Sequence, residues 1–149
     1  MNLKQELFNQ CKKFVENRLE TIQETISSNQ NALQSETKSS AGDKHETGRA
    51  MLQLEMEKAS QQLQDVLQMK ETLAKMNLTK KSTIAHLGSL VKTNQGTYFL
   101  SFSAGKLIVD GENYLAISVS SPIGKLLLGK QEKETFIFNE KTIKIDTIN

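Results

Sequence analysis

A regular spacing of apolar residues, uninterrupted by proline, dominates the first half of the chain. Seven residues separate successive members of four rows: Phe8, Val15 and Ile22; Leu19, Ile26 and Leu33; Leu52, Ala59, Val66 and Leu73; and Met56 and Leu63. Seven residues are close to two helical turns, so each row follows one stripe of a helix. The only proline, Pro122, lies far beyond these rows. The pattern predicts two amphipathic helices with a coiled-coil-like seam.

The segment SSAGDKHETGRA, residues 39–50, separates the two predicted helices and contains the only glycines of the first 80 residues. Each helix would be about 50 Å long at roughly 1.5 Å per residue. Because the connection is short and polar, an antiparallel hairpin is the simplest way to bury both stripes. We therefore predict a coiled-coil hairpin over residues 1–79, with its tip at about residues 39–48.

The second half has a different composition, with glycines, β-branched residues and aromatics. Short strands are predicted at Leu87–Thr93, Thr97–Ser103, Lys106–Val109, Tyr114–Val119, Glu134–Phe138 and Thr142–Ile148. Ser121 before Pro122 begins a short helix well, and Gly129 would end it. The expected fold class is thus α+β: the helical hairpin, a linker near residues 76–82, and a small antiparallel β domain with one short helix over residues 80–149.

Composition narrows the classes of function. The 149 residues are 37% hydrophobic and 24% charged, with a formal net charge of +2, which is too small to indicate a nucleic-acid binder. No apolar run approaches the length needed to cross a bilayer, and the first residues lack the apolar core of a signal peptide. A single cysteine cannot form an internal disulfide. We expect a cytoplasmic protein without a membrane partner.

Two acidic residues at the hairpin tip, Asp43 and Glu46, invite two interpretations. In the first, which the spacing alone favours, they form a capping box: Asp43 caps the second helix and Glu46 reaches back to its N–H. Both charges also suit the positive end of the helix dipole. In the second, the hairpin presents the two carboxylates to a partner, where they complete a Mg²⁺ site, since Mg²⁺ favours one or two carboxylates together with water.

Two motifs together resemble the Gre-type transcript cleavage factors. The tip reads Gly-Asp-Lys-His-Glu over residues 42–46, where that family has Gly-Asp-Leu-Ser-Glu. The segment ISVSSPIGKLLLGK, residues 117–130, is similar to the family's C-terminal signature, Ile-Ser-x-x-Ser-Pro followed by a Gly-Lys pair. The matching positions are Ile117, Ser118, Ser121, Pro122, Leu127, Gly129 and Lys130. The similarity runs over essentially the whole chain.

The resemblance implies an FKBP-like C-terminal domain that docks on bacterial RNA polymerase, and a hairpin that enters the polymerase secondary channel. Asp43 and Glu46 would help to hold the second Mg²⁺ there, so that backtracked RNA is hydrolysed by the polymerase. The chain would be no enzyme by itself and would have no cofactor of its own. Contact with nascent RNA stays open, and so does the oligomeric state, for which a monomer is the simpler expectation. The docking signature would comprise Ser121, Pro122, Gly124, Lys125 and Gly129.

Two other functions stay open. A Gre-like channel binder could regulate or inhibit polymerase without promoting cleavage, because residues 47–50, Thr-Gly-Arg-Ala, replace the family's Asn-Ala-Glu-Tyr. An FKBP-like prolyl isomerase or chaperone with a coiled-coil arm belongs to another class. Its pocket would need aromatic walls, and the C-terminal half offers only six aromatic residues, several of which the sheet core requires.

Three further residues carry reactive groups. His45 lies between the two acids and could be a third metal ligand or a proton shuttle, although an exposed loop histidine is the simpler interpretation. His86 stands alone and is expected to be structural or solvated. Cys11 falls near the stripe of Phe8 and Val15, so we expect a buried small hydrophobic residue.

Overall fold

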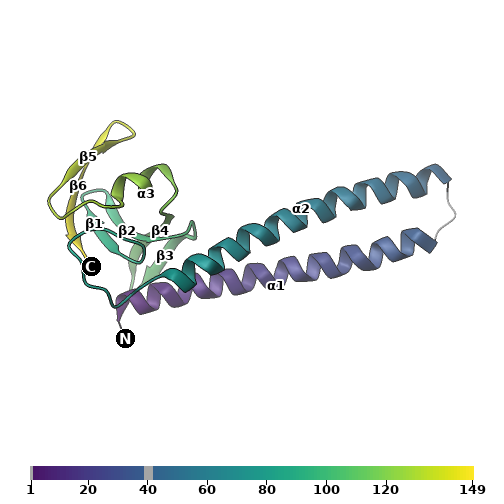
Figure 1. Cartoon of the computed structure of the whole chain (residues 1–149), viewed down its shortest axis with the longest axis horizontal. Coiled ribbons are helices and arrows are strands. Elements are labelled where there is room, and N and C mark those ends of the chain that lie inside the picture. Colours follow the sequence, from purple (N-terminus) through teal and green to yellow (C-terminus); the bar gives the residue numbers. More distant parts are fainter. Residues whose placement is uncertain (1, 39–41) are drawn as a thin grey trace. The chain divides into compact units, whose positions relative to one another are not determined.

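The computed structural model describes the backbone of residues 2–38 and 42–149, and the side chains of these ranges outside residues 36–46. Two long helices come first: α1 (Leu3–Lys38) and α2 (Gly42–Lys75). The later elements are β1 (Leu90–Thr93), β2 (Gly96–Ser101), β3 (Gly105–Val109), β4 (Glu112–Ser118), α3 (Pro122–Leu127), β5 (Thr135–Phe138) and β6 (Lys141–Ile148). The α+β class is confirmed, and each predicted strand overlaps one that is present (Figure 1).

The chain forms two compact units. Val15–Lys70 make up the hairpin unit, whereas Met1–Phe14 and Glu71–Asn149 together make up the sheet unit. The sheet unit therefore contains both ends of the chain. These two units are defined by compactness and differ in their bounds from the two predicted domains, residues 1–79 and 80–149. The domain division itself stays a prediction.

In the hairpin unit, one seven-residue row of each helix forms a buried seam, as predicted, and the neighbouring rows are half-buried. Val15 and Ile22 of α1 are 3% and 7% exposed. On α2, the buried members of the seam are Leu52, Ala59 and Val66. A surface hollow lined by Arg18 and Ile22 from α1 and by Asp65 and Val66 from α2 shows that the two helices lie side by side there. This pairing buries both apolar stripes, which neither helix could do alone.

One polar residue occupies the seam. Asn29 follows Val15 and Ile22 at the same seven-residue spacing and is only 7% exposed. Its Nδ2 has no hydrogen-bond partner among the described residues. A buried amide at such a position costs stability but restricts which alignments of the two helices are acceptable. The sequence analysis missed this residue because it followed apolar residues only.

The sheet has six strands in the order β3-β4-β2-β1-β6-β5. The expectation of a purely antiparallel sheet is wrong for one pair, because β2 and β4 run parallel in the register Tyr98 to Leu115. The chain leaves β2 and places β3 one position further out, so that β4 returns into the space between them (Figure 1). The sheet is therefore mixed.

Tight turns join two of the strand pairs. Asp110 and Gly111 between β3 and β4 have φ of 52° and 79°. Asn139 and Glu140 between β5 and β6 have φ of 50° and 65°. Two successive positive φ angles are typical of a type I′ hairpin, whose twist matches that of the flanking strands. Asn139 and Glu140 are thus the two connecting residues, because β5 ends at Phe138 and β6 begins at Lys141.

The first turns of α1 pack in the core of the sheet unit. Leu7 and Cys11 are fully buried. The Cys11 Sγ lies 3.9 Å from the Ser101 Oγ, and the rings of Phe14 and Phe102 have centroids 6.0 Å apart. The expectation that Cys11 is a buried small residue is confirmed. A further core cluster consists of Ala85, Val91, Tyr98, Leu100, Ile117, Leu127, Ile145 and Ile148.

Burial raises the pKa of the Cys11 thiol to about 11, against a weaker opposing effect of the Ser101 hydroxyl. We expect the native thiol to react with a disulfide reagent at pH 8 at least about 100-fold more slowly than a cysteine in a short peptide, because about two pKa units separate their thiolate populations. A stopped-flow measurement with and without denaturant checks this. A native rate close to that of the peptide would contradict the buried position.

The same shift sets a pH dependence of stability. The unfolded thiol ionises near pH 9 and the folded one near pH 11, so the folded state holds more protons between these values. The free energy of unfolding should therefore fall as pH rises through this window. Comparison of the wild type with Cys11→Ala isolates the thiol, because other groups titrate alike in both proteins.

In the described part of the chain, no helix is both long enough and apolar enough to cross a membrane.

Candidate functional site

The two tip acids fall at the start of α2. The helix begins at Gly42, so the backbones of Asp43 and Glu46 lie in its first turns, three residues apart. Positions i and i+3 are neighbours on one helix face, and negative charge is favourable at this end of the helix. The side chains of residues 36–46, including that of His45, lie outside the described ones. The capping box and the metal-ligand role therefore both stay predictions.

Among the described side chains, no group of three or more His, Cys, Asp and Glu residues lies close enough together to hold a metal ion. Asp43, His45 and Glu46 are not part of that comparison. The donor set that the sequence provides at the tip is two carboxylates. This set suits Mg²⁺, which takes few protein ligands, better than Zn²⁺, which takes several.

The predicted docking signature forms a rigid corner between β4 and α3. Ser121 caps α3: its Oγ accepts a hydrogen bond from the Gly124 N–H at 3.1 Å and donates one to the Ser118 carbonyl at 2.6 Å. Pro122 occupies the first helical position, where no N–H is needed. The expected Ser-Pro helix start is thus confirmed.

Gly124 is required by close packing. A Cβ at this position would overlap the Ser118 carbonyl oxygen and would lie 2.9 Å from the Ser121 Oγ. The helix can turn this tightly against the end of β4 only because Gly124 has no side chain. Gly129, which follows the helix, has φ of 86°, which suits glycine.

The remaining signature residue is solvent-facing. Lys125 lies in the last turn of α3 and is exposed. The corner is fastened to the preceding segment, because the Gly129 N–H donates to the Ala85 carbonyl at 2.9 Å and the Ala85 N–H donates to the Lys130 carbonyl at 2.8 Å. The signature therefore builds a fixed surface on which Lys125 is presented. No described contact assigns it a partner.

His86 has a structural position. Its Nδ1 lies 2.9 Å from the Oγ of Ser89, which is fully buried and also accepts a hydrogen bond from the His86 N–H. The Nε2 is buried without a hydrogen-bond partner in the described part of the chain. These contacts with Ser89, three residues further on, close a local turn.

Sequence reasoning overlooked a basic cavity in the sheet unit. Lys4 and Lys81 line it, from segments 77 positions apart in the sequence (81 − 4). Lys80 and Lys81 lie in the segment predicted as a linker, and Lys4 lies in the first predicted helix. The only signal in the sequence was that Lys4 precedes Leu7 and Cys11 by three and seven residues, which places it on the buried stripe.

No protein-family model matches the chain, and no curated protein matches it. A search of solved structures finds the structure of the transcription factor Gfh1, with 18% sequence identity and a TM-score of 0.33. The match covers 95% of this chain and 92% of that chain. At this level of likeness no functional residue is carried across.

Proposed function

We propose that this protein is a Gre-type accessory factor of bacterial RNA polymerase. It inserts its helical hairpin into the secondary channel and stimulates cleavage of backtracked RNA through Asp43 and Glu46. The observation that carries the proposal is the place of these acids, three residues apart in the first turns of the second long helix, α2. The Ser121-Pro122 corner, built from the motif that resembles the family's docking signature, is consistent with this role.

The hairpin unit has dimensions that suit a channel. From Val15 to Lys38, α1 rises about 35 Å at roughly 1.5 Å per residue, and two paired helices are about 20 Å across. The seam at Val15, Ile22 and Val66 is buried between the helices. Exposed residues along the hairpin are mostly polar, so the unit can enter an aqueous channel without exposing a large apolar surface.

The chemistry proposed for the tip is limited. Two carboxylates contribute negative charge and oxygen ligands but no complete active centre. In the polymerase complex, Mg²⁺ would supply Lewis-acid activation of the phosphodiester and of water. Asp43 and Glu46 would hold it and orient the attacking water by accepting its hydrogen bonds. The hydrolytic activity would remain that of the polymerase, so the factor itself would not be an enzyme.

The test is to add the purified protein to backtracked transcription complexes that carry end-labelled RNA. We expect shortened RNA that appears only with Mg²⁺ and rises with protein concentration until the polymerase is saturated. Absence of binding to polymerase in the same buffer would contradict the proposal. A sample of polymerase without the factor gives the intrinsic cleavage rate.

A second function, inhibition without cleavage, is favoured by one feature of α2. Gly48 lies within the helix, where glycine costs about 1 kcal/mol relative to alanine, and the exposed cation Arg49 follows it. A cation this near the two acids reduces their net negative charge in the channel. In the same assay, slower RNA synthesis without shortened RNA would support this function.

The isomerase alternative has less support. Tyr98, Phe99 and Phe102 are 9%, 0% and 5% exposed, so they build the core of the sheet unit and are not free to line an open peptide pocket. A prolyl-peptide isomerisation assay is expected to give the uncatalysed rate. A rate proportional to protein concentration would instead establish this alternative.

A further inference from the structure

A basic cavity of about 810 Å³ opens on the surface of the sheet unit. Three of the residues that line it are lysines: Lys4, Lys80 and Lys81. Apolar side chains, including Leu90 and Ile148, form part of the wall, and no described lining residue has a carboxylate side chain. A volume of this size lies within the range of about 300–1,000 Å³ that small-molecule sites occupy.

Lys4 is the unusual member of this cavity. It is only 7% exposed, although lysine is rarely buried without a partner. Its backbone N–H donates a hydrogen bond to the Asn2 Oδ1 at 2.9 Å. Its side-chain ammonium group, in contrast, has no ion pair or hydrogen bond among the described residues. Burial lowers the pKa of the Lys4 ammonium group. Partial desolvation of this charge is unfavourable, and an anion in the cavity would offset part of that cost.

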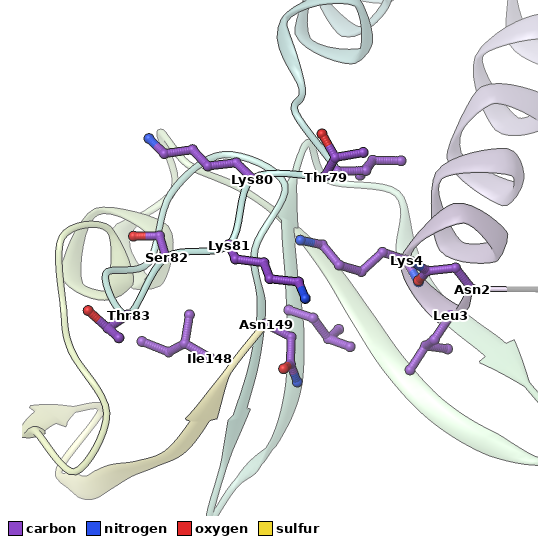
Figure 2. A pocket seen from close by; sticks show the side chains of 12 residues that line it. Asn2, Leu3, Lys4, Thr79, Lys80, Lys81, Ser82, Thr83, Ile148 and Asn149 are labelled. Atoms are coloured by element: carbon purple, nitrogen blue, oxygen red, sulfur yellow. The ribbon is translucent and has the colours of Figure 1, made fainter.

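Figure 2 shows how the three lysines lie. Lys4 extends from α1 into the cavity, and Lys81 extends from the opposite wall toward the same space. Lys80 points away from both. Two ammonium groups are therefore directed into one cavity, and the N-terminus of α1, with its partial positive charge, adds to the same potential.

The walls of the cavity are held in place by hydrogen bonds. Leu90 and Asn149 exchange two backbone hydrogen bonds, each of 2.9 Å. The Asn77 Oδ1 accepts hydrogen bonds from the N–H groups of Thr79 and Lys80, at 3.1 Å and 3.0 Å. These contacts fix the segment that precedes Lys81. The site is thus formed before any ligand arrives, which reduces the entropy lost on binding.

We propose that this cavity binds a small organic phosphate, with the phosphate between Lys4 and Lys81 and the organic part against Leu90 and Ile148. Two ammonium groups match the charge of a phosphate monoester, which is about −1.5 to −2 near neutral pH. The apolar wall gives the organic part a surface to cover. The inference is independent of the function proposed for the hairpin tip, since all lining residues belong to the sheet unit.

The test is isothermal titration of the full chain with phenyl phosphate at fixed ionic strength, beside inorganic phosphate and phenol. We expect phenyl phosphate to bind at least about tenfold more tightly than either fragment, because only it fills both parts of the cavity. Lys4→Met and Lys81→Met should each weaken binding by about tenfold or more, the loss expected for one charge-assisted hydrogen bond. Lys80→Met is the matched control and should change it less than twofold.

Thermal unfolding separates a ligand site from a structural lysine. Lys4→Met keeps the apolar stem and removes the partly desolvated charge, so the free protein should melt roughly 2–4 °C higher while binding of phenyl phosphate is weakened. Lys81→Met carries the binding test if the first variant does not fold. No binding of phenyl phosphate, or equal losses in all three lysine variants, would overturn the proposal.

Discussion

Replacement of both tip acids, Asp43→Ala with Glu46→Ala, is expected to reduce RNA cleavage about 100-fold or more while the protein still binds polymerase. The expectation rests on the proposed function. Loss of both carboxylates removes the oxygen ligands that the tip would add to the polymerase site, and losing electrostatic groups of this kind costs about 10²–10³ in rate. The measurement is the rate of RNA shortening at saturating factor, together with the affinity of each variant for polymerase.

Two controls make this result specific. Glu55→Ala removes an exposed acid from the same helix, away from the tip, and should leave cleavage unchanged. The isosteric pair Asp43→Asn and Glu46→Gln removes charge but keeps size. If the wild type and the alanine variant both bind and neither cleaves, the capping role is the better account. The variant should then lose about 1 kcal/mol of stability, which urea unfolding would detect.

Gly124→Ala is expected to destabilise the protein by about 2–3 kcal/mol, and so to lower its melting temperature by roughly 5–10 °C. The added methyl group would overlap the Ser118 carbonyl oxygen, which is backbone and cannot rotate away. The Ser121 cap holds the same corner from the other side through its hydrogen bond to the Gly124 N–H. Differential scanning calorimetry of the two proteins measures the change.

The matched control lies in the same helix. Lys125 is exposed, and Lys125→Ala should change stability by no more than about 0.5 kcal/mol. If the Gly124→Ala protein melts within a degree of the wild type, the corner is looser than its geometry indicates. If the corner is the docking surface, Gly124→Ala should also weaken polymerase binding at temperatures where both proteins are folded.

Repetition made the hairpin predictable from sequence, because the same seven-residue spacing recurs in both helices. The six strands were predictable from alternation and turn residues. The parallel pairing of β2 with β4 was not, because strand order depends on where β3 is placed and not on any local pattern. Asn29 was not predicted to be buried for a different reason. It is polar, and its seam position follows only from its spacing to the apolar residues Val15 and Ile22.

The sites divide in a similar way. The Ser-Pro corner could be predicted from the sequence because Ser121, Pro122 and Gly129 each have a local conformational preference. The cavity around Lys4 was not readable, since it depends on residues from both ends of the chain meeting in the fold. For the tip acids, sequence gives the spacing and the structure gives the helix that carries them.

The sheet unit is assembled from the first 14 residues and the last part of the chain, which has a consequence for the order of folding. During synthesis, Leu7 and Cys11 are made first but find their core partners last. Until the sheet unit forms, the apolar side chains of Leu7 and Cys11 stay exposed to solvent. The hairpin needs only neighbouring segments and can pair early, and it then brings Phe14 and Glu71 toward each other. This shortens the effective loop that the sheet unit has to close, and so lowers its entropic cost.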